Sequence, residues 1–309
     1  MITMRTASRR SSVVQMAMVA AALATLGVAQ AGAQAKPSML VSTGWLAEHL
    51  SDPNLVILHV GNKAQYDSGH APGARHVTLT EVAVPQVEGG LTLQMASVEQ
   101  LTAWAVANGI SNHTRVIVVP HDENLQSATR VFITLAYLGA FERTSVLNGS
   151  FKAWKAEGRA ITKDTPPAAR AVAFTPKLRP ELIATLAQVE AITSDSGRTA
   201  LIDARLPRFY NGDGGGYPRP GHIPTAVNIP LNTVSANGFV KPAAELKSLF
   251  AAAGVNGDKP IVTYCHIGQQ ATVLWFVATL LGYDARMFDG SFQEWSGTAR
   301  LPLVVPPPK

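Results

Sequence analysis

Cysteine is almost absent from this sequence of 309 residues, which contains Cys265 and no second thiol. A chain with one cysteine forms no intramolecular disulfide, so the class of small secreted folds held together by disulfides is excluded. The eight histidines show no spacing with the single cysteine that is typical of a metal site. No bound metal is therefore predicted, and the lone thiol needs an explanation of its own.

Acidic residues are absent from residues 1–35. Three arginines precede an apolar run over 13–29, and small residues in an A-x-A pattern follow near Ala33 and Ala35. This layout predicts a cleaved signal peptide over 1–35 and a periplasmic or secreted protein, and it disfavours a membrane anchor. The Sec route is expected, and the pair Arg9-Arg10 also allows a twin-arginine route.

Long apolar runs are absent after the leader, so no membrane association is predicted for the mature protein. The chain has 26 basic and 21 acidic residues, and removal of three leader arginines leaves 23 basic residues and a net charge of +2. This small excess gives no indication of nucleic-acid binding. The roughly 270 remaining residues suggest two domains of ordinary size.

The chain repeats itself once. The segment LNGSFKAW at 147–154 matches FDGSFQEW at 288–295, and GHAPGA at 69–74 resembles GHIPTA at 221–226. Two matches in the same order indicate a duplicated domain. Each copy reads as short apolar strands alternating with helices, which is typical of a parallel sheet with helices on both faces.

The predicted elements follow the same order in both copies. In the first copy, strands are expected over 55–60, 116–119 and 144–147, with a helix that ends at Gly139. In the second copy, a capping box at Thr185 and Gln188 opens a helix. Strands are then expected over 200–203, 226–229, 260–264 and 285–288, with an apolar helix over 271–281. The proline-rich stretch 161–180 is the predicted linker between domains at 38–160 and 181–301.

Cys265 directly follows a predicted strand and precedes a predicted buried helix by a short loop, CHIGQQ. In open α/β sheets, ligands bind at the carboxyl ends of strands, and such a loop directs backbone N–H groups and a helix N-terminus at one point. This setting favours a nucleophilic thiolate and an anionic persulfide. Gly268 suits a turn that needs an unusual φ or a close approach of the backbone.

A lone cysteine is also often a small buried apolar side chain. The first copy offers a comparison, because its matching loop over 120–126 has no cysteine and carries Asp122 and Glu123. A site for an anion is not built from two acids. We therefore predict that the first domain is inactive and that the second is catalytic.

These motifs together resemble the two-domain rhodanese family over residues 38–301. The resemblance rests on the Gly-His-x-Pro segments, on the run Asp203-Ala204-Arg205, on the Cys265 loop and on the repeated Gly-Ser-Phe-x-x-Trp segments. It implies an α/β fold of two tandem rhodanese-like domains. It also implies a sulfurtransferase without a cofactor, whose partners are a small-molecule sulfur donor, thiosulfate or 3-mercaptopyruvate, and a thiophilic acceptor such as cyanide.

The resemblance also implies substrate-binding arginines. Arg205 matches the Asp-x-Arg element, and Arg208 is the best match for a second arginine that binds the donor. Two guanidinium groups suit a dianion or a carboxylate. The alternative for Arg205 is a buried ion pair with Asp203, and Arg219 is a further candidate for contact with an anion.

The loop itself departs from both known subgroups, because His266 and Ile267 stand where a cationic pair or a small neutral pair is usual. His266 either carries partial charge near neutral pH or faces solvent. The backbone of Gly268 and the side chains of Gln269 and Gln270 either contact the donor or brace the loop. The donor therefore stays open between thiosulfate and 3-mercaptopyruvate.

Two other functions remain as alternatives. Related folds use a cysteine loop for arsenate or phosphate esters, but those loops are one residue longer and end in arginine, where this chain has Gln270. A non-enzymatic periplasmic module that binds sulfur or docks a partner is the second alternative.

Overall fold

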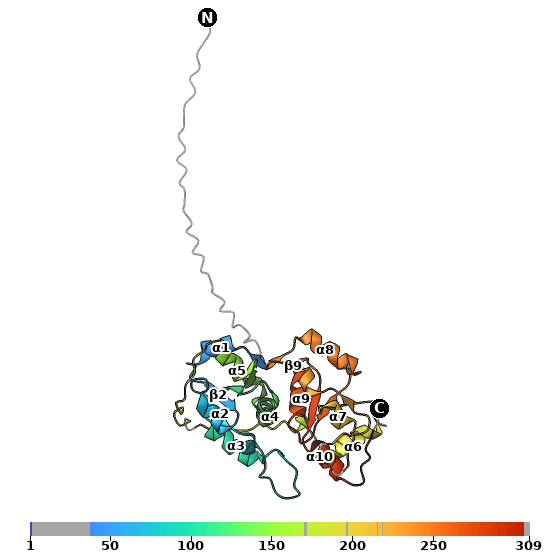
Figure 1. The fold of residues 1–309 in the computed structure, drawn as a ribbon. Helices are drawn as coiled ribbons and strands as arrows, with labels where there is room; N and C mark the ends of the chain where they lie inside the picture. Colours follow the sequence, from blue (N-terminus) through green and yellow to red (C-terminus); the bar gives the residue numbers. More distant parts are fainter. Residues whose placement is uncertain (2–37, 170–171, 196, 215, 218, 306–309) are drawn as a thin grey trace. The chain divides into compact units, whose positions relative to one another are not determined.

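The computed structural model describes Met1 and residues 38–169, 172–195, 197–214, 216–217 and 219–305 (Figure 1). The predicted signal peptide, residues 1–35, lies outside the described residues apart from Met1. Within these ranges, no helix has both the length and the apolar character needed to cross a bilayer.

The first copy forms a five-stranded parallel sheet with strand order β1-β5-β4-β2-β3. Its strands are β1 (Leu40–Val41), β2 (Leu55–Val60), β3 (Arg75–Val77), β4 (Arg115–Pro120) and β5 (Thr144–Leu147). Its helices are α1 (Thr43–His49), α2 (Lys63–Ser68), α3 (Val98–Ala107), α4 (Gln126–Leu135) and α5 (Ser150–Ala156).

Side chains on this sheet alternate between two apolar layers. Ile57 belongs to the layer that includes residues of α1 and α5, whereas its neighbour Leu58 belongs to the layer that includes residues of α3 and α4. Helices therefore cover both faces of the sheet, as predicted from the alternating pattern of strands and helices.

The second copy has the same topology, with strand order β6-β12-β11-β7-β8 and all pairs parallel. The strands are β6 (Ile183–Ala184), β7 (Ala200–Asp203), β8 (Val227–Asn228), β11 (Ile261–Tyr264) and β12 (Ala285–Phe288). The helices are α6 (Leu186–Ser194), α7 (Pro207–Tyr210), α8 (Ala243–Ala252), α9 (Ala271–Leu280) and α10 (Ser291–Gly297). A small antiparallel hairpin of β9 (Ser235–Ala236) and β10 (Phe239–Val240) lies between β8 and α8 in the chain.

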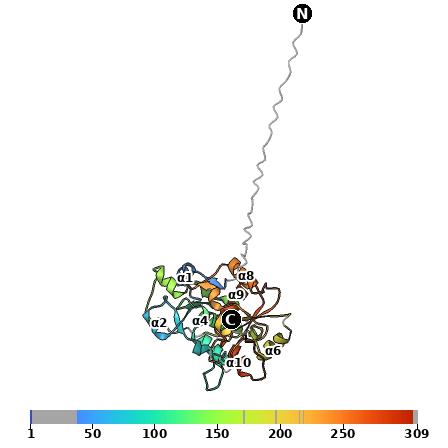
Figure 2. The ribbon, with the colours of Figure 1, turned by 45° about the vertical axis from the view of Figure 1, so that its right-hand side comes forward.

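Helices α4 and α9 lie side by side and join the two domains (Figure 1 and Figure 2). The hydroxyls of Thr129 and Thr272 are 2.7 Å apart, and the rings of Phe132 and Phe276 meet edge to face at 5.0 Å. One apolar cluster therefore runs through both domains. This packing explains why α9 is apolar all round: it is covered by its own sheet and also by a helix of the other domain.

Most predicted elements match the structure. The capping box at Thr185 is present, and β2, β4, β5, β7, β8, β11 and β12 lie at or within a residue or two of their predicted ranges. Helix α4 ends at Leu135 and continues as a π turn, Ala136–Ala140, in which Gly139 has φ +88°. The two-residue edge strands β1 and β6 were not predicted, because two residues carry no periodicity.

The predicted linker over 161–180 has one isolated bridge, between Thr162 and His70, and no helix or strand in its described residues before Pro180. A 3-10 turn, Pro180–Leu182, then leads into β6. Other 3-10 turns are Leu79–Val82, Phe141–Arg143 and Leu231–Thr233.

Candidate active site

Cys265 lies at the carboxyl end of β11, the central strand of the second sheet, and its side chain is fully buried. The loop from Cys265 to Gln270 connects this strand to α9, which begins at Ala271. The predicted arrangement of strand, loop and buried helix is therefore present. Parallel strands direct their carboxyl ends to the edge of the sheet where ligands bind.

The start of the loop is held by the N-terminus of α10. The N–H of Cys265 donates to the hydroxyl of Ser291 at 3.1 Å, and that hydroxyl donates to the Phe288 carbonyl at 2.8 Å. The N–H of Phe292 donates back to the Cys265 carbonyl at 2.9 Å. Ser291 adopts a positive φ of 51° to reach this position. From the sequence, its motif was recognised only as a repeat, because a serine hydroxyl carries no periodic signal.

The backbone N–H groups from His266 to Ala271 belong to the loop and to the first residue of α9. Within the described part of the chain, none of them donates to a protein acceptor. Six consecutive unpaired donors at the start of a ten-residue helix are an arrangement that binds anions. The loop therefore has the donor set that an anionic sulfur species needs.

Gly268 shows both features that its position suggested. Its φ is +77°, and a Cβ at this residue would lie 2.5 Å from the backbone oxygen of Asp289. The close approach is thus to another backbone segment of the protein. The Gly268 carbonyl accepts a hydrogen bond of 3.2 Å from Arg130, a residue of the first domain that was not predicted from the sequence.

Arg205 forms a buried ion pair with Asp203, which was the alternative to a role in substrate binding. Its guanidinium donates to both oxygens of Asp203 at 2.6 to 3.0 Å and to the Gly221 carbonyl at 2.8 Å. Its charge lies 3.9 Å from the centre of the Phe292 ring. Burial disfavours this charge, but the hydrogen bonds and the charge of Asp203 outweigh burial, so that the pKa of Arg205 is raised.

Arg208 differs from Arg205 because it is exposed. It lies on the short helix α7, with its guanidinium 4.4 Å from the centre of the Phe209 ring, and Phe209 in turn packs edge to face against His266 at 4.7 Å. Its guanidinium has no hydrogen-bonded partner among the residues that the structure describes. Arg208 therefore offers a charge near the loop that no carboxylate compensates there.

Arg219 occupies a different environment. Its guanidinium donates to five backbone carbonyls around the C-terminal end of α10, those of Trp295, Ser296, Thr298, Ala299 and Leu301. A cation at the C-terminus of a helix stabilises the unpaired carbonyls there. These contacts explain Arg219 as a cap of α10 rather than as a contact for an anion.

His266 is half-buried between two aromatic rings. Its Nδ1 lies 3.1 Å from the hydroxyl of Tyr217, and the two rings stack at 5.6 Å. Burial, and then the charge of Arg205, lowers the pKa of His266 to about 4, so the imidazole is neutral at pH 7. Burial, and then the neighbouring Cys265, raises the pKa of Tyr217 to about 12, so Tyr217 keeps its proton.

The two glutamines of the loop lie close to the first domain. The Gln269 amide donates to the Ser127 hydroxyl of the first domain at 3.2 Å. The Gln270 side-chain oxygen is buried and has no partner among the described residues, and Gln270 lines a cavity of about 380 Å³ between α9 and the 123–126 segment. Ile267 is half-buried. Gln269 thus braces the loop against the first domain.

The first copy has no thiol at the corresponding place. Strand register places Pro120 where the second copy has Cys265, His59 where it has Asp203, and Gly61 where it has Arg205. The Nε2 of His59 lies 2.9 Å from the Nδ1 of His121. Burial, and then the charge of His121, lowers the pKa of His59 to about 3, so this pair is neutral.

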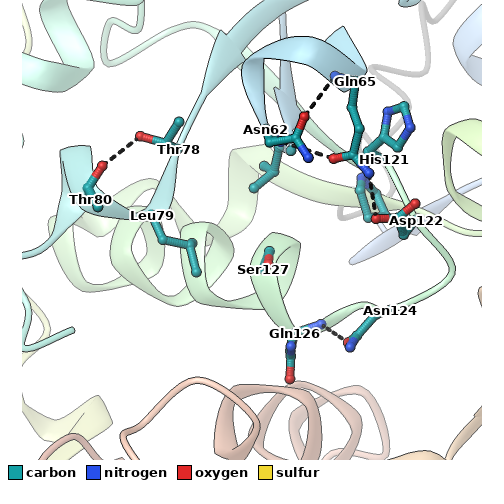
Figure 3. Close-up of a pocket in the computed structure, with 13 residues that line it drawn as sticks. Asn62, Gln65, Thr78, Leu79, Thr80, His121, Asp122, Asn124, Gln126 and Ser127 are labelled. Atoms are coloured by element: carbon teal, nitrogen blue, oxygen red, sulfur yellow. Dashed lines mark hydrogen bonds between the residues drawn. The ribbon is translucent and has the colours of Figure 1, made fainter. Parts of the chain in front are cut away.

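A pocket of about 460 Å³ lies over this loop of the first copy (Figure 3). The Gln65 amide donates to the Asp122 carboxylate at 3.0 Å, and Figure 3 shows this contact beside His121. The described residues that line the pocket include no cysteine and no arginine or lysine. Across the described residues of the chain, no group of three or more His, Cys, Asp or Glu side chains is arranged to hold a metal ion.

This chain is similar to known proteins over most of its length. The family described as rhodanese-like domain matches the chain twice, at residues 42–157 and 185–298. The sulfur carrier protein TtuD of Thermus thermophilus is 33% identical over 289 residues, which cover 87% of this chain and 98% of that protein. A putative thiosulfate sulfurtransferase of Synechococcus elongatus is 33% identical over 292 residues, which cover 90% of this chain and 88% of that protein.

A solved structure agrees with these relatives. The crystal structure of SseA from Escherichia coli, described as having the rhodanese fold of 3-mercaptopyruvate sulfotransferases, superposes with a TM-score of 0.74 at 26% identity. The match covers 83% of this chain and 99% of that one. The fold is thus that of a protein with two tandem α/β domains of the rhodanese type. The chain belongs to the rhodanese family of sulfurtransferases.

Proposed function

We propose that this protein transfers sulfane sulfur through a persulfide on Cys265. The observation that supports the proposal most is the loop of six backbone N–H groups that donate to no acceptor among the described residues. This loop begins directly after the only thiol of the sequence. Such a loop stabilises a negative charge on a sulfur atom one bond beyond Sγ. The sulfur carrier and the sulfurtransferases among the relatives support the same chemistry.

The reaction is a double displacement. The Cys265 thiolate attacks the outer sulfur of thiosulfate, the S–S bond of the donor breaks, and sulfite leaves with the electron pair. With 3-mercaptopyruvate, the C–S bond breaks instead, and the leaving enolate takes the thiol proton to become pyruvate. A thiophile such as cyanide then attacks the outer sulfur of the persulfide, and the thiolate is released.

Burial of Cys265 fits this cycle. The thiol is fully buried, but an S–S bond of about 2 Å moves the reactive sulfur outward from Sγ, above the loop. The outer sulfur then lies closer to the surface than the thiol itself. We infer that the persulfide is the form that meets the acceptor, while the free thiol is shielded from unrelated oxidants.

The charges near the loop favour 3-mercaptopyruvate over thiosulfate. Asp203 compensates Arg205, and His266 is neutral, so Arg208 is the cation near the loop that has no carboxylate partner in the described structure. One guanidinium suits a monoanion, such as the carboxylate of mercaptopyruvate, better than a dianion. We therefore expect a higher kcat/KM with 3-mercaptopyruvate, and the reverse ranking would contradict this assignment of the donor.

Intact-protein mass spectrometry tests the function directly. The mature protein is incubated with each donor, and we expect a mass gain of one sulfur atom that cyanide or a thiol removes. C265S serves as the control and gains no sulfur. If the wild type gains none with either donor, the proposal is wrong.

The same experiment separates the alternatives. A persulfide that forms but is never passed to cyanide, glutathione or dithiothreitol favours a module that binds sulfur without turnover. Hydrolysis of an aryl phosphate that depends on Cys265 favours an oxyanion enzyme instead. Gln270 at the end of the loop speaks against the second alternative, because no arginine is present there to hold a phosphate dianion.

We also propose that residues 1–35 direct export to the periplasm or the cell exterior. The support is the order of basic, apolar and small residues in the sequence. N-terminal sequencing of protein recovered from the exported fraction is expected to begin at Gln34 or Lys36, after cleavage at Ala33 or Ala35. Recovery of an uncleaved chain in the cytoplasm contradicts this prediction.

A further inference from the structure

Arg130 connects the first domain to the loop of the second. It lies on α4, and its side chain is 1% exposed although it carries a full charge. The guanidinium donates to the Gly268 carbonyl at 3.2 Å and to the Leu93 carbonyl at 2.6 Å, and it forms an ion pair with Asp289. A buried arginine is costly unless every contact is satisfied, so this cluster has a defined geometry.

The contact with Gly268 sets the direction of one N–H group in the loop. The peptide bond between Gly268 and Gln269 is trans, so its C=O and N–H point in opposite directions. Arg130 holds the C=O side. The Gln269 N–H therefore points away from Arg130, and within the described chain it donates to no protein acceptor. Because glycine turns freely at φ +77°, an external contact is needed to keep this peptide in one orientation.

Because Asp289 compensates the charge of Arg130, we expect Arg130 to act on the loop by orienting the Gly268 peptide and not through its charge. Its carboxylate pairs with Arg130 and accepts the N–H of Met95 at 2.9 Å, so the guanidinium charge is compensated locally. Segment 92–95 of the first domain is fixed at the same place, because Gln94 donates to the Asp289 carbonyl at 3.2 Å and the Thr92 N–H donates to Gln293 at 2.8 Å. The cluster therefore has four parts: α4, this segment, the turn between β12 and α10 that carries Asp289, and the loop that carries Cys265.

The cluster has no equivalent on the other loop. The run Ala128-Thr129 of α4 matches Ala271-Thr272 of α9, so the residue of α9 that matches Arg130 is Val273. The residue of the first copy that matches Asp289 is Asn148, which instead accepts the N–H of Val240. Valine and asparagine form no ion pair. The only loop held in this way is the one with the cysteine.

We propose that Arg130 is a positioning residue of the catalytic loop, supplied by the domain that has no nucleophile. It holds the Gly268 carbonyl so that the Gln269 N–H faces the anionic sulfur. The proposal rests on the proposed function of Cys265. It also assigns a role to the first domain, which completes the anion-binding loop of the second.

The test compares R130K and R130M with wild type and with the control R143M. Arg143 also donates to two carbonyls, of Ser111 and Thr114, but both lie in the first domain. Alkylation rates of Cys265 are measured with anionic iodoacetate and neutral iodoacetamide, which both form an S–C bond and release iodide. Their ratio reports recognition of the anion by the loop and does not depend on overall stability.

We expect the iodoacetate to iodoacetamide ratio to fall about 10-fold in both Arg130 variants and to stay unchanged in R143M. The rate of persulfide formation is expected to fall by a similar factor, with most of the loss in kcat. If R130M does not unfold cooperatively in a thermal melt, R130K decides. Lysine keeps a positive charge beside Asp289, but it has no planar guanidinium whose Nη1 donates to the Gly268 carbonyl and to Asp289 together.

Unchanged ratios and persulfide rates in a folded R130K overturn the positioning role. An equal fall in R143M also overturns it, because the effect is then one of general stability. Failure of the proposed function looks different: the wild type then takes up no sulfur from either donor, while the alkylation ratios can still be measured.

Discussion

The two domains share one scaffold but differ at the carboxyl ends of two adjacent strands. In both copies the Gly-His-x-Pro histidine stacks on a tyrosine at 3.7 Å, as His70 on Tyr66 and His222 on Tyr210. These residues are retained where there is no thiol, so they serve the fold. The differing residues are Cys265, Asp203 and Arg205 in one copy against Pro120, His59 and Gly61 in the other.

The difference shows how little of the scaffold is specific to the chemistry. A buried ion pair and a thiol occupy the same strand ends that a neutral histidine pair and a proline occupy in the first domain. The sheet, the covering helices and the tryptophans Trp154 and Trp295 do not change. The chemistry therefore depends on a few loop residues, while the parallel sheet only determines where the loop lies.

The largest effect is expected from exchanging the thiol between the copies. C265S should reduce sulfur transfer to background, because no other nucleophilic sulfur exists in the chain. P120C should not restore it in the C265S background, because the first loop carries Asp122 and the described residues that line its pocket include no arginine or lysine. Thiocyanate formation from each variant measures both. Activity in the double variant shows that the difference between the loops is the thiol alone.

The next largest effect concerns the buried ion pair. D203A leaves Arg205 charged and unpaired in a fully buried site, which is expected to cost about 3–5 kcal/mol of unfolding free energy. The matched change in the first copy, H59A, removes a neutral side chain and should cost less. The double variant D203L/R205M should recover most of the loss, because apolar residues then fill the site. Urea unfolding of the three variants measures their unfolding free energies and so ranks their stabilities.

A smaller effect concerns acid stability. The pKa of His59 is lowered to about 3, so its contribution to stability is present above its unfolded pKa of about 6.5 and is lost as the pH falls toward 3. Between pH 6.5 and 5 this amounts to about 2 kcal/mol. H59Q does not titrate and should show a flatter dependence over this range. Equal slopes for H59Q and wild type contradict the assignment.

The smallest effects are expected at the rim of the active loop. Y217F loses the hydrogen bond to His266 and should lower kcat/KM about 2- to 10-fold. Because the pKa of His266 is about 4, neither wild type nor H266N should show an inflection of kcat/KM near pH 6.5 that arises from this histidine. R208Q should raise the KM for 3-mercaptopyruvate several-fold with little change in kcat. Initial rates between pH 5 and 9 test all three variants.

Much of the fold could be read from the sequence, because its signals are local or repeated. The duplication places the second set of elements once the first is recognised, and the apolar runs at 55–60 and 261–264 have the length and bounds of buried strands. The position of Cys265 between a strand and a helix follows in the same way. The edge strands β1 and β6 were missed because pairing with a neighbour, not their own pattern, makes them strands.

The amino-acid order alone thus specified two copies of one domain, one thiol and the loop that carries it, because strand and helix periodicity is a property of neighbouring residues. It did not specify the contacts of the arginines, since identical guanidinium groups pair with Asp203, cap α10 or reach Gly268 from another domain. These partners are up to 138 residues apart in the chain. Packing of α4 against α9 brings Arg130 to the loop. This contact joins residues that are distant in the chain, so the periodicity of neighbouring residues cannot predict it.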